Sequence, residues 1–442
     1  MVRANLICSS LLLAGLTAAS ETGDLTILSM NVAGLPAILQ SNDVPGDKTT
    51  NSRLIGTYFA KYGYDVIHVQ EDFNYHAYIY ETDTHAYRTA TSGGAAIGSG
   101  LNALANFDWV GFTRVKWNDC SSASGADCLT PKGFTFMRLQ VAEGVYIDAY
   151  NLHTDAGTED DDEKARNSNL KQVADYIDTW SEGNAVLVFG DTNSRYTRTA
   201  DNIRIFGTQN GLTDPWVELV RDGVEPTVES LCANPSTTNS CETVDKVFYR
   251  GSSIIDLSAT SFNYESKKFL QADGNVLSDH NPVGVNFTWS LSSSLRQSNL
   301  FGGPHGEWFT DLPSLATLLS SSSSVPKPAK LSFSGASRLD SVSITLKDGT
   351  KFTHGGDGGT AANLELGTSE YWTDATVCWG KKSGQTRIFY IKAQTSKGNT
   401  VNAGTTTDDC SSIKAPTSWQ IVGFLGQDGD EVDQLGFIFS PQ

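Results

Sequence analysis

The sequence is poor in positive charge. Lysine and arginine number 32 against 50 aspartates and glutamates, a formal net charge of −18. Residues 21–290 hold 19 basic and 36 acidic side chains, a net charge of −17, and residues 291–442 hold 12 and 14, a net charge of −2. Neither part has the basic surface typical of proteins that package DNA or read its sequence. An acidic enzyme can still bind phosphate when metal ions supply the missing positive charge.

Apolar runs long enough to cross a membrane are also missing. The run Leu6–Leu16 follows Arg3 and precedes the small residues Ala18, Ala19 and Ser20. It is shorter than the roughly 20 residues that a bilayer-spanning helix needs. The pattern predicts a secretory signal peptide over residues 1–20. We therefore expect a secreted, extracellular protein without a transmembrane segment.

The cysteines lack the spacing of a zinc site. There is no CxxC pair, and no histidine stands at ligand spacing from a cysteine. Of the seven cysteines, Cys8 belongs to the predicted signal peptide, so six remain. An even number in a secreted chain predicts disulfides, here the three local pairs Cys120–Cys128, Cys232–Cys241 and Cys378–Cys410.

The length of 442 residues suggests two or three domains. From Leu25 to Trp289, short β-rich runs alternate with helical patterns, which predicts an α/β sandwich on a mostly buried sheet. An acidic stretch, Glu159–Glu163, is expected as a loop before a helix that runs to Trp180. The segments expected to be regular are the strands Leu25–Val32, Asp65–Gln70, Val145–His153 and Ala185–Gly190, and the helices Arg53–Tyr62 and Ala165–Trp180.

The pattern changes after residue 292. Helical periodicity nearly disappears, and glycine-rich turns separate short alternating runs, which predicts an all-β domain. The run Ser320–Ser324 is expected as a polar loop or a second linker. The expected strands are Ser341–Lys347, Arg387–Gln394, Trp419–Phe424 and Gln434–Phe439.

Polar residues stand where the strands of the first body end, which is where α/β proteins place their chemistry. Taken singly, each is more often a turn, a cap or a structural residue. Their order along the chain is what carries information. They are Asn31, Glu71, His153, Asp191 with Asn193, Asp245, and Asp279 with His280.

In this order the residues resemble the endonuclease/exonuclease/phosphatase superfamily. That group includes pancreatic-type deoxyribonucleases, abasic-site endonucleases, neutral sphingomyelinases and inositol-polyphosphate phosphatases. The resemblance covers roughly residues 24–289 and implies a catalytic domain over residues 21–291. It implies a four-layered α/β sandwich, an active site at one edge of two packed sheets, and dependence on Mg²⁺ or a similar ion such as Mn²⁺ or Ca²⁺.

The resemblance also suggests ligands for the metal ion. Glu71, helped by Asn31, offers the hard oxygen ligands that Mg²⁺ prefers, and the ion acts as a Lewis acid on the phosphate. Asp279 is expected as a further ligand from the other side. Asp191 is expected either to ligate a second ion or to take the proton of the attacking water. Asn193 offers its amide to a phosphate oxygen.

Two histidines are expected to move protons. His280 is the candidate general base, with Asp245 holding its ring and favouring its charged form. His153 is expected to hydrogen-bond the phosphate or to protonate the leaving group. Which group takes which of these tasks stays open.

Some positions depart from the deoxyribonucleases. Phe73 stands where those enzymes carry a basic residue, and the carboxylate that orients their first histidine has no counterpart here. The cysteines before the segment that begins Pro131-Lys132 agree with the secreted nucleases. Lys132 is expected either to face the phosphate or to be a solvated loop residue.

Residues 298–442, after a linker over residues 292–297, resemble the jacalin-related lectins. The resemblance rests on segments such as Phe301–Trp308 and His354–Gly359, and on Gly429–Asp433, which matches the Gly-x-x-x-Asp sugar-binding loop of that family. It implies a β-prism of three four-stranded sheets with a shallow, metal-free sugar site. The candidate glycan-binding residues are Gly302, Gly303, Asp430 and Asp433. Sugar binding can also have been lost, with the glycines serving only as turns.

These observations favour a secreted, metal-dependent phosphodiester hydrolase that its lectin domain holds on glycan-bearing surfaces. A phospholipid head group or another small phosphodiester is the expected substrate. A secreted nuclease of the deoxyribonuclease type is an alternative. A second alternative is a glycan-binding protein with an inactive catalytic body.

Overall fold

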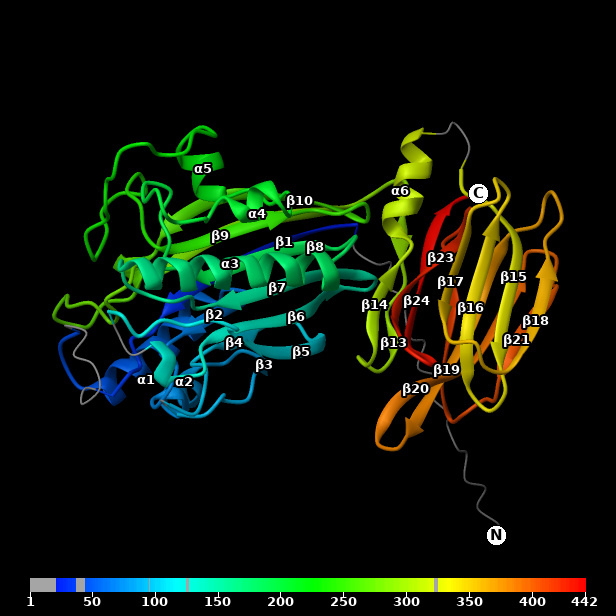
Figure 1. The fold of residues 1–442 in the computed structure, drawn as a ribbon, viewed down its shortest axis with the longest axis horizontal. Coiled ribbons are helices and arrows are strands. Elements are labelled where there is room, and N and C mark those ends of the chain that lie inside the picture. Colours follow the sequence, from blue (N-terminus) through cyan, green and yellow to red (C-terminus); the bar gives the residue numbers. More distant parts are fainter. Residues whose placement is uncertain (1–20, 37–43, 95, 125–126, 322–324) are drawn as a thin grey trace, which may run out of the picture.

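The computed structural model describes residues 21–36, 44–94, 96–124, 127–321 and 325–442. The predicted signal peptide, residues 1–20, lies outside the described residues, as do residues 322–324 of the serine run. An α/β body and an all-β body lie side by side (Figure 1). Within the described ranges, no helix is long and apolar enough to span a lipid bilayer.

The first body is built on two sheets. One has the strand order β10-β11-β1-β2-β4-β3 and the other the order β5-β6-β7-β8-β9. The pairs β1–β2 and β7–β8 are parallel, so the carboxyl ends of these strands meet at one edge. The strands are β1 (Thr22–Asn31), β2 (Val66–Gln70), β3 (Tyr87–Arg88), β4 (Asn102–Ala105), β5 (Trp109–Lys116), β6 (Gly133–Ala142), β7 (Val145–Leu152), β8 (Ala185–Asp191), β9 (Asp245–Arg250), β10 (Ile255–Tyr264) and β11 (Val283–Leu291).

The two sheets pack face to face and carry helices on their outer faces. Between the sheets, His68 of β2 stacks on Phe189 of β8 with ring centroids 3.6 Å apart. On one side, α1 buries Ile55 and Phe59 against the outer face of β1 and β2. On the other side, α3 lies over β7 and β8 (Figure 1). The predicted four-layered sandwich is confirmed. The helices are α1 (Lys48–Tyr62), α2 (His76–Thr82), α3 (Asp160–Trp180), α4 (Ile205–Thr208) and α5 (Pro215–Val220), with short 3-10 turns at Asp127–Leu129 and Ser266–Lys268.

The acidic stretch Glu159–Glu163 is the first turn of α3, so the prediction of a loop there is wrong. Glu159 caps the helix, and it and Asp162 exchange side-chain-to-backbone hydrogen bonds in a capping box. Carboxylates are stabilised at this position because the first N–H groups of a helix are unpaired and the helix dipole is positive there.

The second body has three antiparallel sheets, as predicted for a β-prism, but one of them has five strands instead of four because the short strand β13 also pairs with β24. Their strand orders are β12-β24-β23-β14 with β13 against β24, β17-β16-β15-β18, and β21-β20-β19-β22. The strands are β12 (Arg296–Gln297), β13 (Phe301–Gly302), β14 (Glu307–Thr310), β15 (Pro328–Gly335), β16 (Leu339–Leu346), β17 (Lys351–Gly355), β18 (Thr360–Glu365), β19 (Trp372–Lys382), β20 (Gln385–Thr395), β21 (Thr400–Gly404), β22 (Asp409–Lys414), β23 (Trp419–Asp428) and β24 (Val432–Pro441).

This body also contains one helix that the sequence analysis missed, α6 (Leu312–Ser321). Leu312 and Leu315 are buried on one face of it, which gives the helix an apolar attachment to the β-domain. Ser320 and Ser321 form its last residues, so the prediction of a loop is wrong for these two positions.

The second body packs on the first at the edge where β7 and β8 begin. Asn299 accepts hydrogen bonds from Gln140 and from the backbone N–H of Gly144, both at 2.8 Å. The guanidinium of Arg138 lies 3.5 Å from the ring centroid of Trp308. Within the expected linker 292–297, Arg296 and Gln297 already form β12. The two bodies are therefore joined by direct packing as well as by the chain.

Candidate active site and sugar site

A cleft of about 650 Å³ lies at the edge of the first body where β1, β2, β7 and β8 end. Part of its wall is polar and part is apolar, and the apolar part is lined by Leu35, Phe73, Ala96, Leu129 and Ala156. Because Asn31 and Asp245 contact residues of the polar wall from behind, the fold brings together all eight residues of the predicted constellation. The six that line the cleft are Glu71, His153, Asp191, Asn193, Asp279 and His280.

Asn31 and Glu71 end neighbouring parallel strands and lie together. The last residue of β1, Asn31, pairs with Gln70, so Glu71 follows one residue beyond the end of β2. The amide nitrogen of Asn31 donates to Glu71 Oε1 and to Asp191 Oδ2, both at 3.2 Å. Glu71 has a φ of 57°, a left-handed conformation that is rare for a residue with a side chain. This turn of the backbone directs the carboxylate into the cleft.

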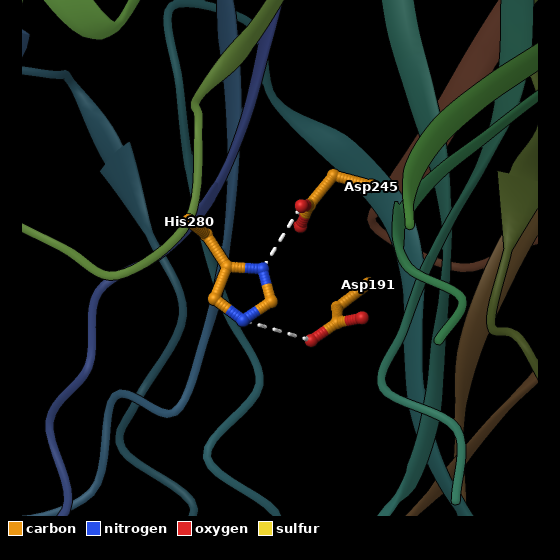
Figure 2. Close-up of side chains that lie close together, drawn as sticks. All are labelled: Asp191, Asp245 and His280. Carbon is orange, nitrogen blue, oxygen red and sulfur yellow. Dashed lines mark hydrogen bonds and ion pairs between the residues drawn. The ribbon is translucent and has the colours of Figure 1, made fainter. Parts of the chain in front are cut away.

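His280 lies between two carboxylates (Figure 2). Its Nδ1 is 2.9 Å from Asp245 Oδ2, and its Nε2 is 3.8 Å from Asp191 Oδ2. Burial opposes the charged ring, but the attraction of Asp245 and Asp191 is stronger, so the pKa of His280 lies well above its usual value. Burial raises the pKa of Asp245, against the attraction of His280. The three side chains share a proton network.

Asp191 is the residue on which the polar wall converges. It is buried and lies near His280, His153 and the amide of Asn31. Burial would raise its pKa, but the neighbouring charges, led by His280, bring the pKa below its usual value. Its Oδ1 accepts from the backbone N–H of Asn193, whose φ of 45° is again left-handed. Asp191 is therefore ionised and held in place.

His153 is buried beside Lys132. Its Nε2 is 3.0 Å from Lys132 Nζ and 3.5 Å from Asp191 Oδ2. Burial, followed by the charge of Lys132, lowers the pKa of His153 to about 3. Its buried Nδ1 has no hydrogen-bond partner among the described residues, which agrees with the missing orienting carboxylate. His153 is a neutral imidazole at pH 7.

Two lysines add positive charge to an acidic site. Lys132 lines the cleft and forms an ion pair with Asp127. Lys48 donates to the carbonyls of Ala33 and Leu35, both at 2.7 Å, and it is close enough to Glu71 to interact electrostatically. The sequence left two interpretations of Lys132 open and said nothing of Lys48, because a lysine within a helical pattern looks like any solvated residue.

The remaining predicted ligand, Asp279, is exposed at the rim of the cleft. The loop that carries it is fixed from both sides, because Ser278 Oγ donates to the carbonyl of Asn31 at 2.6 Å and His280 N donates to Ser278 Oγ at 3.0 Å. Phe73 is buried, and it contributes an apolar surface to the cleft where a basic residue was considered.

The oxygen-rich side of the cleft fits a divalent cation. Among the described residues, one hydrogen-bond donor, the Asn31 amide, contacts the Glu71 carboxylate. Burial raises the pKa of Glu71 despite the nearby charge of Lys132, and a bound cation would favour the ionised carboxylate. Asp191, Asp245 and His280 also offer atoms within 4.8 Å of one another. Because both nitrogens of His280 face carboxylates, the Glu71 side is chemically the better site for an ion that prefers oxygen.

In the second body, three of the four predicted glycan-binding residues lie together. Gly303 N donates to the carbonyl of Asp433 at 3.0 Å, and a Cβ on Gly302 would lie 2.3 Å from the same oxygen, so a side chain there would collide. Arg387 Nε lies 2.7 Å from Asp433 Oδ1, a contact that the sequence did not predict. Burial raises the pKa of Asp433 to about 6, despite Arg387. Asp430 is exposed, and no hydrogen bond or ion pair of its side chain to these residues is among the described contacts.

Comparison with known families agrees with this geometry. Residues 16–224 match the model for "Endonuclease/Exonuclease/phosphatase family 2", and residues 298–438 match the model for "Jacalin-like lectin domain". The chain joins a phosphatase-family domain to a jacalin-like lectin domain. The first match ends before Asp245 and His280, which the fold nevertheless brings to the same cleft. The three disulfides predicted from the cysteine spacing are also present, at Cys120–Cys128, Cys232–Cys241 and Cys378–Cys410.

Relatives exist for each domain. The chain is 36% identical over 276 residues to a sphingomyelinase of Mycobacterium tuberculosis, an alignment that covers 60% of this chain and 53% of the relative. It is 27% identical over 125 residues to horcolin of Hordeum vulgare, covering 26% of this chain and 86% of horcolin. The structure of sphingomyelinase C from Streptomyces griseocarneus has 18% identity and a TM-score of 0.42, covering 60% of this chain and 99% of that chain. The chain thus spans about half the length of the curated sphingomyelinase that it matches.

Proposed function

We propose that this chain is a secreted, divalent-metal-dependent phosphodiester hydrolase that acts on a phospholipid head group and is held on glycan-bearing surfaces by its lectin domain. The observation that carries the proposal is the convergence of Glu71, Asp191 and His280 in one cleft that is also lined by apolar residues such as Leu35, Phe73 and Leu129. A polar wall suits a phosphodiester, and an apolar wall suits the hydrocarbon that follows it. The 36% identity to a sphingomyelinase supports the same class of substrate.

In this proposal Glu71 and Asn31 hold Mg²⁺ or a related ion. When bound there, the ion would supply the positive charge that the developing charge on the phosphoryl oxygens requires. Asp191 and Asn193 orient the attacking water and one phosphate oxygen. Asp279, at the rim, is proposed as a further ligand on the open side.

His280 is proposed as the group that takes the proton of the water, with Asp245 holding its ring. The two carboxylates around it favour the charged ring, so His280 is free to accept a proton only when some of their negative charge is neutralised. Positive charge near Asp191 has this effect. Binding of the cation and activation of the base are therefore coupled in this site.

The leaving oxygen is proposed to depart toward His153 and Lys132. His153 is neutral at pH 7, so its role is to hydrogen-bond and to position Lys132, with which it is in contact at 3.0 Å. Lys132 is the cation nearest to this part of the cleft. Water thus adds to phosphorus while His280 takes its proton, the bond to the leaving oxygen breaks, and that oxygen takes up a proton from Lys132.

Secretion and glycan binding are supported by separate features. Three disulfides are characteristic of proteins that fold in an oxidising compartment. Asp433, Gly302 and Gly303 present a carboxylate and closely approaching backbone, which suits the hydroxyl groups of a sugar. Such a tether raises the local concentration of substrate without a new catalytic contact.

One experiment separates this proposal from the two alternatives. The purified chain is incubated with sphingomyelin, phosphatidylcholine, plasmid DNA, RNA and inositol phosphates, with Mg²⁺ and with EDTA. We expect release of a phosphorylated head group that EDTA abolishes. Cleavage of DNA in preference to lipid would favour the nuclease, and no cleavage of any of them would favour an inactive catalytic body.

A further inference from the structure

Most of the large apolar side chains that are exposed in the first body lie on three loops that are linked to the cleft or to its neighbouring residues. Eight large hydrophobic residues are exposed among those described. Five of the eight lie on three loops of the first body, with exposed fractions of 78, 69, 64, 77 and 47%: Ile97, Leu129, Val224, Val228 and Leu231. Single exposed hydrophobic residues are common on proteins, but several around one opening indicate an interaction surface. We call these five residues the apolar rim.

Each of the three loops is connected to the cleft. Leu129 lines it, and Ile97 follows Ala96, which also lines it. The loop with Val228 is held close by the ion pair of Arg195 with Glu229 at 3.4 Å, and Arg195 stands two residues after Asn193. Farther along the same loop, Asn234 donates to the carbonyl of Ser278 at 2.8 Å, beside Asp279 and His280.

The lectin domain leaves the apolar rim uncovered. It packs where β7 and β8 begin, whereas the cleft lies where they end. The eight residues of β7 separate the two edges by about 25 Å, at roughly 3.3 Å per residue. In Figure 1 the lectin domain lies to the right of the first body.

Charge restricts the surface that the rim can meet. The carboxylates of Asp127, Asp279, Glu225 and Glu229 lie among or next to the apolar residues, and residues 21–290 carry a net charge of −17. An anionic surface would be repelled, whereas a surface with zwitterionic head groups meets no such penalty. The apolar side chains can then enter the boundary between head groups and acyl chains.

We propose that the apolar rim docks the cleft onto the surface of a zwitterionic phospholipid bilayer, without help from the lectin domain. The proposal rests on the proposed function, because it gives the same cleft its route to a lipid substrate. The apolar wall of the cleft continues the rim inward through Leu129 and Ala96, so that a lipid could rise from the bilayer into the cleft along apolar surface. The lectin domain, at the far edge, is left to bind glycans that project away from the bilayer.

The test uses the full-length chain and a triple variant, Ile97→Ser, Val224→Ser and Val228→Ser, none of which lines the cleft. The control variant is Val325→Ser, an apolar residue of the lectin domain that is 40% exposed. Binding to glycan-free phosphatidylcholine vesicles is measured by flotation in EDTA. Hydrolysis is then measured with Mg²⁺ on sphingomyelin vesicles and on bis(p-nitrophenyl) phosphate, a water-soluble phosphodiester.

We expect vesicle binding and hydrolysis of vesicle lipid to fall at least about 10-fold in the triple variant. Its hydrolysis of the water-soluble ester should be unchanged. The control variant should behave as the wild type in all three measurements. Equal vesicle binding by the triple variant would overturn the proposal. So would stronger binding of the wild type to phosphatidylglycerol vesicles than to phosphatidylcholine vesicles. If no phosphodiester is cleaved but vesicle binding depends on the rim, the docking stands and the proposed activity fails. If the soluble ester is cleaved but no vesicle is bound, the activity stands and the docking fails.

Discussion

The proton network around His280 gives the sharpest test of the site. We predict that Asp245→Asn, which keeps the shape of the side chain and removes its charge, lowers kcat by about 10²- to 10⁴-fold, the range that a positioned acid or base contributes. In the structure Asp245 is buried and its Oδ2 lies 2.9 Å from His280 Nδ1, so an amide oxygen can keep the contact but not the charge. A tenfold change in rate corresponds to about 1.4 kcal/mol, so the expected loss of transition-state stabilisation is about 3 to 5 kcal/mol.

The same substitution should leave the fold intact. Burial raises the pKa of Asp245, which means that the folded site partly resists its negative charge. A neutral amide does not carry the cost of burying a negative charge. We therefore expect the free energy of unfolding to change by no more than about 1 kcal/mol, or about 2–4 °C in Tm for a domain of this size. The pH profile should also change: without Asp245 the pKa of His280 falls, so the acidic limb of the rate profile, where the base loses its proton, moves to lower pH.

The assay compares kcat at saturating Mg²⁺ from pH 5 to 9 with thermal unfolding followed by circular dichroism. Asp214→Asn is the matched control, since Asp214 is also a buried aspartate with a raised pKa but accepts from Tyr196 and Trp216 at a distance from the cleft. A wild-type rate for Asp245→Asn would refute the role of His280 as a positioned base. A loss of rate equal to that of the control, with equal loss of Tm, would show that the effect is only structural.

Three further predictions concern other parts of the chain. Glu71→Gln should abolish the rise in Tm that Mg²⁺ produces in the wild type, and the melting curve without metal should be unchanged; a retained Mg²⁺ effect would place the ion elsewhere. Burial raises the pKa of Asp433 to about 6, so its carboxyl is protonated below that pH. Retention on a glycan column should therefore be full at pH 7.5 and fall as the pH drops through 6. Retention that stays constant to pH 5 would contradict this prediction. Trp308→Ala removes the ring that lies against Arg138, a cation–π contact that contributes about 0.5–2 kcal/mol. The substitution should speed proteolytic separation of the two domains and leave cleavage of a soluble phosphodiester unchanged. Unchanged proteolysis would argue that this contact does not hold the domains together.

The sequence indicated which polar side chains stand at strand ends, but not which other residues contact them in the folded protein. Strand ends could be recognised because apolar runs stop at polar residues, and this marked Asn31, Glu71, His153 and Asp191 as residues at the ends of strands. The distances among them depend on how two sheets pack, and nothing in a linear pattern states that His68 of one sheet meets Phe189 of the other. For the same reason the sequence did not reveal Lys48 and Arg387. Each contacts a residue that is distant in the sequence, Lys48 the carbonyl of Ala33 and Arg387 the carboxylate of Asp433.

Local errors had local causes. The acidic run before Trp180 looked like a loop because its charge masks helical periodicity, although carboxylates are favoured in a first helical turn. The helix α6 was missed because it is short and stands inside an all-β pattern.

By itself, then, the sequence determined which side chains are candidates to bind a cation, a phosphate or a sugar, and in which order strands and turns present them, because periodicity and turn chemistry are properties of neighbours along the chain. The tertiary structure alone decided that an imidazole is enclosed by two carboxylates, that one histidine is neutral, and that the lectin domain and the cleft occupy opposite edges of the same strands. Those outcomes depend on burial and on distances between segments up to 247 residues apart, such as Asn31 and Ser278, and only packing creates them.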